Sequence, residues 1–290
     1  MLSRLLPMVT AAAASEHKVA PALKDVLSRA AAASKKANLS KPPRLVAVSK
    51  TKPNELVKEA YDAGHRDFGE NYVQEISEKA PQLPHDIRWH FIGHLQSNKA
   101  KAVIDAVPNL AVVETVDSVK LANKLNNAVK GQERDPLDIY VQVNTSGEES
   151  KFGVEPKDCV SLAEHVHKEC DVLRFAGLMT IGQQDYTSRP EDFQCLARCR
   201  EEVCNALNLK PEDVELSMGM SGDFEKAATC RKHGARVRAP GATGAGALPP
   251  HNGNYGVMCT ADCCGQHKHP SGLNHLWEAG LHRVQAFRSQ

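Results

Sequence analysis

The chain has 290 residues, of which 41% are hydrophobic, and its formal net charge at pH 7 is +1. This length accommodates one barrel or two ordinary domains, and the balanced charge lacks the basic footprint of a nucleic-acid-binding protein. No apolar run reaches the roughly 18 residues of a membrane span. The nine cysteines follow no convincing secretion signal and indicate reduced thiols rather than a disulfide framework. We therefore expect a cytoplasmic globular protein, with mitochondrial import as an alternative because Arg4 precedes any acidic residue.

The first predicted element is a helix over residues 16–37. This stretch is rich in alanine and carries Val19 and Leu23 at helical spacing. The two prolines at the end of Lys41–Pro43 block its extension. Residues 1–42 are accordingly interpreted as an N-terminal extension with a leading helix.

Seven short apolar runs follow, and segments with apolar residues at helical spacing separate them. The runs begin near residues 44, 65, 88, 111, 137, 173 and 214. This alternation is typical of βαβ units, and spacings of roughly 20 to 40 residues match the repeat of a TIM-type α/β barrel. The helix after the fourth run is expected to begin behind a capping Asp117. We predict the barrel over residues 43–228.

The alternation stops after Thr229, where no further run resembles a buried strand. Residues 229–290 are rich in Gly, His and Cys and are expected to form a poorly ordered tail. An eighth strand, which a closed barrel needs, is therefore not predicted. Five potential soft metal ligands crowd this tail, but their spacing matches no paired C-x-x-C zinc site, so no metal is assigned. These residues are Cys259, Cys263, Cys264, His267 and His269.

Lys50 ends the first apolar run, at the position where functional groups gather in a parallel barrel. An amine at the mouth of an apolar barrel is partly desolvated, which lowers its pKa and exposes a nucleophilic nitrogen for a Schiff base. The alternative is a solvated lysine that merely ends a strand.

The seventh run ends in the segment Ser217–Ser221, just before a helix expected to begin near Gly222. Two hydroxyls, the close backbone approach permitted by Gly219, and free amides at a helix start suit a phosphate. The alternative is a serine cap in an ordinary turn. Asp223 would repel a phosphate unless its side chain pointed outward.

Neutral hydrogen-bonding groups follow or end other runs and are further candidates for ligand contacts, although each is also readily explained as a structural polar group. They are Asn71, His90, His94 and Asn144. Walker, G-x-G-x-x-G and G-x-S-x-G motifs are absent from the sequence, which argues against nucleotide hydrolysis, dinucleotide chemistry and a serine hydrolase.

Together these segments resemble the pyridoxal phosphate homeostasis protein family from about Pro43 to Ala228, with the motifs in family order. The motifs are Leu45–Lys52, Phe68–Tyr72, Trp89–Gln96, Asn144–Lys151, Gly177–Thr180 and Leu216–Asp223. The resemblance implies a barrel similar to the N-terminal domain of alanine racemase, with pyridoxal 5'-phosphate (PLP) held as an aldimine on Lys50. It also implies that Ser217 and the turn through Gly219 and Ser221 hold the phosphate.

The same resemblance implies that Asn71 and His90 line the cofactor cleft, and that the protein is a carrier that passes PLP to apo PLP-dependent enzymes rather than an enzyme itself. In the family, an eighth strand with an Arg-Ile-Gly-Ser/Thr pattern follows, whereas here the segment Ala228–Arg238 takes its place. Two alternatives stay open. One is a racemase-like PLP enzyme, which would need a second base opposite the lysine. The other is an isoform whose changed C-terminus prevents PLP binding.

Overall fold

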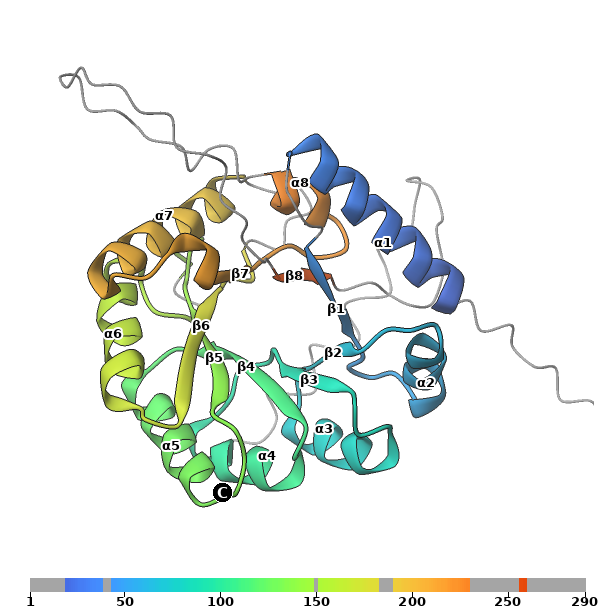
Figure 1. Cartoon of the computed structure of the whole chain (residues 1–290), viewed down its shortest axis with the longest axis horizontal. Helices are drawn as coiled ribbons and strands as arrows, with labels where there is room; N and C mark the ends of the chain where they lie inside the picture. Colours follow the sequence, from blue (N-terminus) through green and yellow to red (C-terminus); the bar gives the residue numbers. More distant parts are fainter. Residues whose placement is uncertain (1–18, 39–42, 149–150, 183–189, 230–255, 260–290) are drawn as a thin grey trace, which may run out of the picture.

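A single parallel sheet forms the centre of the molecule in the computed structural model, which describes residues 19–38, 43–148, 151–182 and 190–229 and the backbone of residues 256–259. The strand order is β7-β6-β5-β4-β3-β2-β1-β8. The strands are β1 Arg44–Val48, β2 Asp67–Glu70, β3 Arg88–Phe91, β4 Leu110–Val116, β5 Leu137–Gln142, β6 Leu173–Met179, β7 Glu215–Ser217 and β8 Gly256–Cys259. Figure 1 shows the strands around a central axis, with the helices outside them. The predicted TIM-type α/β barrel and its first seven strands are confirmed.

Helices cover the outer face of the sheet (Figure 1). They are α1 Val19–Lys36, α2 Asn54–Asp62, α3 Val73–Lys79, α4 Ala100–Ala106, α5 Val119–Lys130, α6 Cys159–Glu169, α7 Pro190–Leu207 and α8 Phe224–Thr229. Because strand side chains alternate between the two faces, one set from each strand points outward into the core beneath the helices. Phe68 and Trp89 belong to this set: their rings lie 6.0 Å apart and both side chains are fully buried. Each such buried aromatic contributes roughly 1.5–3 kcal/mol.

The predicted leading helix is confirmed as α1, which packs beside α2 and α8. Glu59 of α2 accepts a hydrogen bond from the backbone of Ala20 at 3.1 Å. On the other side, the guanidinium of Arg29 lies 2.9 Å from the carboxylate of Glu225 and 4.9 Å from the centre of the Phe224 ring. The helix therefore closes the outside of the barrel near its first strand.

An eighth strand, which the sequence analysis did not predict, lies beside β1. β8 pairs with β1 in parallel from Arg44 opposite Gly256 to Ala47 opposite Cys259. Cα atoms of β7 and β8 also come within 8 Å of each other, so the two ends of the sheet meet. Four residues in a glycine-rich tail carry too weak a periodic signal to predict a strand, and tertiary pairing with β1 decides their conformation. The rest of the tail predicted over residues 229–290 lies outside the described residues, apart from Thr229.

The expected cap of α5 is wrong by one residue. Ser118, not Asp117, occupies the N-cap position, and its hydroxyl accepts a hydrogen bond from the amide of Leu121 at 3.3 Å. Asp117 instead lies 3.5 Å from the imidazole of His94. A serine and an aspartate are equally good caps, so the sequence alone did not separate these neighbours.

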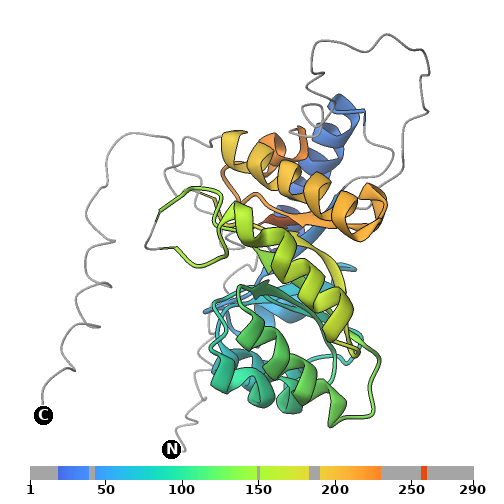
Figure 2. The ribbon, with the colours of Figure 1, turned by 90° about the vertical axis from the view of Figure 1, so that its left-hand side faces the viewer.

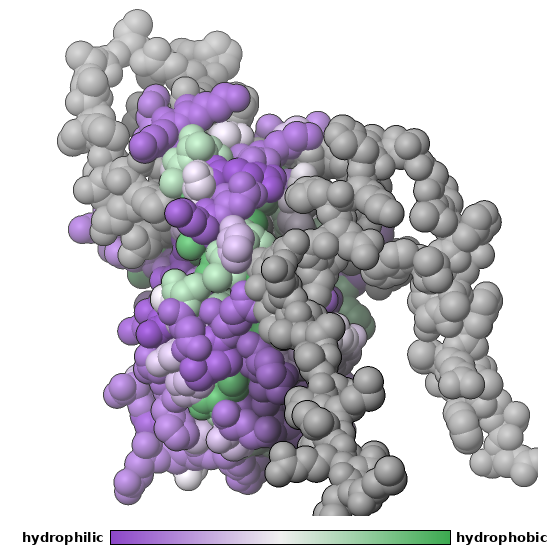
Figure 3. Space-filling view, turned by 90° about the vertical axis from the view of Figure 1, so that its right-hand side faces the viewer, coloured by the Kyte–Doolittle hydropathy of each residue, from purple (hydrophilic) through white to green (hydrophobic). Residues whose placement is uncertain are grey.

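The face that carries α1 and α2 is largely hydrophilic in Figure 3, apart from a hydrophobic strip across its middle. Figure 2 shows the ribbon from the opposite side, where helices again lie outside the strands. Among the described helices, none has the length and apolar content to span a bilayer. The cysteines with described side chains are all free thiols: Cys159, Cys170, Cys195, Cys199 and Cys204.

Replacing Gly177 by alanine is expected to destabilise the barrel by about 1–3 kcal/mol through overpacking. A Cβ at this position of β6 would lie 2.4 Å from the backbone oxygen of Glu215 in the paired strand β7. Urea unfolding measures the effect. Gly131→Ala is the control, because a Cβ there meets no atom closer than 3.6 Å. Equal stabilities of the two variants would contradict the close approach of β6 and β7.

Candidate functional site

The polar residues predicted to form a site are brought to one end of the barrel or into its interior. Lys50 follows β1 and Asn71 follows β2, while His90 lies within β3. Ser217 ends β7 and begins the turn that contains Gly219 and Ser221. Because the strands are parallel, the residues that follow them share the carboxyl-terminal rim of the barrel.

Lys50 is half-buried at this rim. Within the described part of the chain, its amine makes no hydrogen bond and no ion pair. Most charged groups at such a depth have a partner, since an unpaired charge is costly to desolvate. An amine in this position is therefore available to a ligand.

Asn71 presents a second unfilled group at the rim. Its side-chain oxygen Oδ1 is buried and has no hydrogen-bond partner among the described residues. The loop after β3 presses against it: a Cβ on Gly93 would lie 2.0 Å from the backbone oxygen of Asn71. Buried polar atoms are nearly always paired, so an orphaned acceptor beside Gly93 fits a ligand that brings a donor.

His90 lies in the barrel interior and is only 1% exposed. Its Nδ1 lies 2.6 Å from Glu114 of β4, and its Nε2 lies 3.3 Å from Asp67 of β2. The other oxygen of Glu114 accepts a hydrogen bond from the hydroxyl of Ser217 at 2.5 Å. A continuous polar chain therefore crosses the interior from β2 to β7, and the predicted contact of His90 with a cofactor stays a prediction.

The charged side chains in this interior row stabilise one another's ionised forms. Burial favours the neutral imidazole, but the hydrogen bonds and negative charges of Asp67 and Glu114 outweigh it and raise the pKa of His90 to about 8. Burial also opposes ionisation of Asp67, yet His90 and Arg88 hold the pKa of that carboxyl well below its usual range. We conclude that His90 is a buried cation at neutral pH.

In the turn after β7, Gly219 allows the backbone to lie close against helix α8. Gly219 has φ 92°, and a Cβ there would lie 2.8 Å from the Cβ of Ala227 in α8, so a larger residue does not fit. Helix α8 begins at Phe224 rather than near Gly222. The carboxylate of Asp223 accepts a hydrogen bond from the amide of Met220. That amide is therefore already used inside the turn. Ser221 lies at the exposed edge of the same turn.

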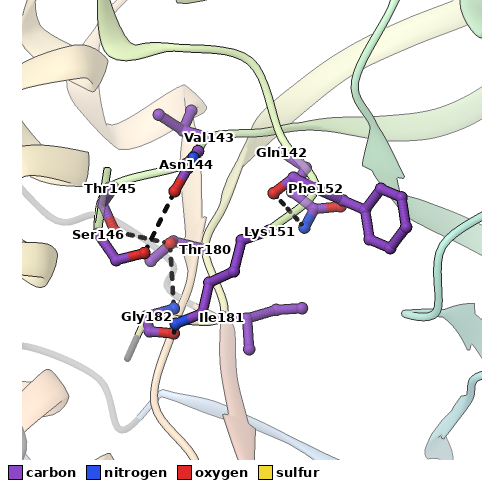
Figure 4. A pocket seen from close by; sticks show the side chains of 10 residues that line it. All are labelled: Gln142, Val143, Asn144, Thr145, Ser146, Lys151, Phe152, Thr180, Ile181 and Gly182. Atoms are coloured by element: carbon purple, nitrogen blue, oxygen red, sulfur yellow. Dashed lines mark hydrogen bonds between the residues drawn. The ribbon is translucent and has the colours of Figure 1, made fainter. Parts of the chain in front are cut away.

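A cavity of about 190 Å³ opens beside the ends of β5 and β6 (Figure 4). The hydroxyls of Thr145 and Thr180 lie 2.8 Å apart at its wall, and Lys151 donates to the backbone oxygen of Gly182 at 2.6 Å. Asn144, which the sequence analysis named, is part of the same wall. The surface that lines the cavity is mostly apolar, with hydroxyl and amide groups at its wall, and the ammonium of Lys151 is shared with Glu148 at 3.3 Å. Such a lining suits a small molecule that carries a few polar groups.

Sequence reasoning missed the two carboxylates of the interior chain, Asp67 and Glu114. A signal was present, because Glu114 interrupts an otherwise apolar run and Asp67 begins another. A charged residue inside a strand of this kind rarely points into an apolar core without a partner. The potential zinc ligands of the tail have no described side chains, and no group of three metal-binding side chains occurs in the described ranges.

Comparison with known proteins defines the class. The family model for the alanine racemase N-terminal domain matches residues 23–249. The fold agrees: the chain superposes on alanine racemase from Clostridium difficile with a TM-score of 0.53 at 15% identity, covering 85% of this chain and 58% of that one. The chain therefore belongs to the alanine racemase N-terminal domain family.

Closer relatives narrow the assignment. The chain is 54% identical over 194 residues to the pyridoxal phosphate homeostasis protein of Bos taurus, a match that covers 64% of this chain and 71% of the relative. It is 50% identical to the Homo sapiens protein of that name, over 67% of this chain and 74% of the relative. Within the racemase-like class, the chain is thus a member of the pyridoxal phosphate homeostasis protein family, as the sequence motifs predicted.

Solved structures agree with this placement. A structure of PipY from Synechococcus elongatus with PLP bound has a TM-score of 0.60 and 26% identity to this chain. The alignment covers 83% of this chain and 97% of PipY. An unknown protein from Bifidobacterium adolescentis has a TM-score of 0.66 and 30% identity, over 83% of this chain and 93% of that one.

We predict that the His90 imidazole titrates with a midpoint near pH 8 in the folded protein. Because this pKa lies above the usual value of 6.5, protonated His90 stabilises the folded protein. Its contribution to the free energy of unfolding is complete below about pH 6.5 and is lost as the pH rises through 8. The difference corresponds to about 2 kcal/mol. NMR titration of the histidine rings measures the midpoint. His65 is the internal control, because burial lowers its pKa. A midpoint for His90 at or below that of His65 would contradict a charged interior.

Proposed function

We propose that this chain binds PLP through a reversible imine to Lys50 and acts as a carrier or buffer of the cofactor. The observation that carries the proposal is the half-buried amine of Lys50, which has no partner among the described residues and lies at the rim of a barrel of this family. PipY, a similar protein by structure, was crystallised with PLP bound. The relatives named above carry a name that refers to homeostasis of this cofactor.

The residues at the rim fit the chemical groups of PLP. The cofactor supplies an electrophilic aldehyde, a pyridine ring and a phosphate. Lys50 offers the amine for the aldehyde, and the orphaned oxygen of Asn71 offers an acceptor for a donor on the ring. The turn through Gly219 and Ser221 is proposed to offer backbone amides to the phosphate.

Ser217 has a narrower role in this proposal than a direct phosphate contact. Its single proton is donated to Glu114, which leaves only lone pairs for any other partner. A phosphate needs donors, so a direct contact would require the bond to Glu114 to break. We infer that Ser217 chiefly fixes the start of the turn, while Ser221 and amides of the turn other than that of Met220 hold the phosphate.

A carrier role follows from the chemistry of an imine. An aldehyde held on a lysine is protected from stray amines, and another amine can displace it, so apo PLP-dependent enzymes are the proposed recipients. The cytoplasm, with a mitochondrial fraction as the alternative, stays the predicted location. Racemases share the fold with this chain at less than 25% identity. That likeness gives no specific support to racemase activity, since one fold hosts many activities.

Purified protein mixed with PLP is expected to develop a long-wavelength imine absorbance, and borohydride reduction should attach PLP to the peptide that contains Lys50. Lys50→Ala should lose both signals because it lacks the amine. Lys58→Ala is the matched control, since this lysine lies on the exposed face of α2 in an ion pair with Asp62. Absorbance spectroscopy and peptide mass mapping make the measurement.

Two results would contradict the proposal. An imine that persists in Lys50→Ala, or that never forms in the wild-type chain, would remove the assigned cofactor site. PLP-dependent loss of one amino-acid enantiomer would instead show that the chain is an enzyme.

A further inference from the structure

Lys50 lies between two residues whose backbones are held by neighbouring elements. On its amino-terminal side, the amide of Ser49 donates to the backbone oxygen of Gly69 at 2.9 Å. The backbone oxygen of Ser49 accepts a hydrogen bond from the ammonium of Lys79 at 2.6 Å. Lys79 ends α3, so this contact joins the end of β1 to a helix outside the barrel.

On the carboxyl-terminal side, Thr51 has φ 60°, in the left-handed region that a β-branched residue rarely occupies. Its amide donates to the carboxylate of Glu75, also on α3. A conformation of this kind is unfavourable and persists only where surrounding contacts determine it. The hydrogen bond to Glu75 is such a contact.

The two contacts belong to one cluster, formed by the buried Glu70 and Lys79 and the half-buried Glu75. The ammonium of Lys79 lies 2.7 Å from Glu70 and 2.6 Å from Glu75, and the lysine is 6% exposed. Glu70 is fully buried and also accepts the hydroxyl of Ser49 at 2.6 Å. A buried ion pair is weak evidence of a stabilising role, because the desolvation penalty offsets much of the attraction. Here we expect the ion pair to fix the backbone positions of Ser49 and Thr51 rather than to add stability.

We propose that the Glu70, Glu75 and Lys79 cluster positions the Lys50 amine for attack on the PLP aldehyde. The inference rests on the proposed function and names positioning residues for its central step. By holding the backbone on both sides of Lys50, the cluster restricts where its flexible side chain begins. Restricting the approach of two reacting groups lowers the entropic part of the barrier.

The step that benefits is imine formation. The unprotonated nitrogen of Lys50 would attack the aldehyde carbon and form a carbon–nitrogen double bond as the bonds from that carbon to oxygen break. The oxygen leaves as water, and its two protons balance the two that the amine nitrogen loses. No oxidant or reductant is involved. The cluster contacts Ser49 and Thr51 rather than the reacting atoms, so it should change the rate of this step and not the affinity of the preceding encounter with PLP.

Stopped-flow absorbance with increasing PLP separates these two quantities. In Glu75→Ala, the saturating rate of imine formation is expected to fall roughly tenfold, while the half-saturating PLP concentration stays unchanged. Glu75→Gln keeps an oxygen acceptor for the Thr51 amide and should retain the wild-type rate. Lys79→Met provides a second test and should slow the step as Glu75→Ala does. Lys58→Met, which removes an exposed ion pair on α2, is the control and should behave as the wild type.

A purely structural role would lower the folded fraction, and hence the amplitude, without changing the saturating rate of the molecules that are folded. Unchanged saturating rates in Glu75→Ala and Lys79→Met would therefore overturn the inference. So would a Glu75→Gln variant as slow as Glu75→Ala, because the amide keeps the acceptor. Absence of an imine in the wild-type chain would overturn the proposed function itself.

Discussion

The parallel direction of the strands is the constraint on which the rest of the structure depends. Because every strand of the sheet runs the same way, the residues that follow β1, β2 and β7 meet at one rim. Lys50, Asn71 and the turn that contains Gly219 are far apart in the sequence and come to the same end of the barrel only through this arrangement. β1 pairs with β2 on one side and with β8 on the other, so the strand that Lys50 follows is not an edge strand.

The interior polar chain connects this rim with the barrel core. The His90 ring is hydrogen-bonded to the carboxylates of Asp67 and Glu114, and Glu114 also accepts a hydrogen bond from Ser217. For a histidine at 1% exposure, the hydrogen bonds and negative charges of the two partners offset the cost of burying its charge. The start of the proposed phosphate turn is therefore fixed by electrostatics inside the barrel, and the Lys50 loop by a separate cluster outside it.

The sequence predicted the barrel and its first seven strands because period and length distinguish short buried runs from helices. It did not predict β8, since four residues depend for their conformation on the partner strand β1. Lys50 was named as a candidate Schiff-base lysine because functional groups gather where the strands of a parallel barrel end. The roles of Glu75 and Lys79 were not predictable, because their helical spacing is typical of a surface pair. Only the tertiary fold, in which α3 packs against β2, brings them to Ser49 and Thr51.

A crystal structure of the chain grown with PLP tests the central claim most directly. The account predicts continuous electron density between the Lys50 side-chain nitrogen and the cofactor, with the phosphate at the turn through Gly219 and Ser221. Density that joins PLP to a different lysine, or a phosphate bound away from this turn, would contradict it.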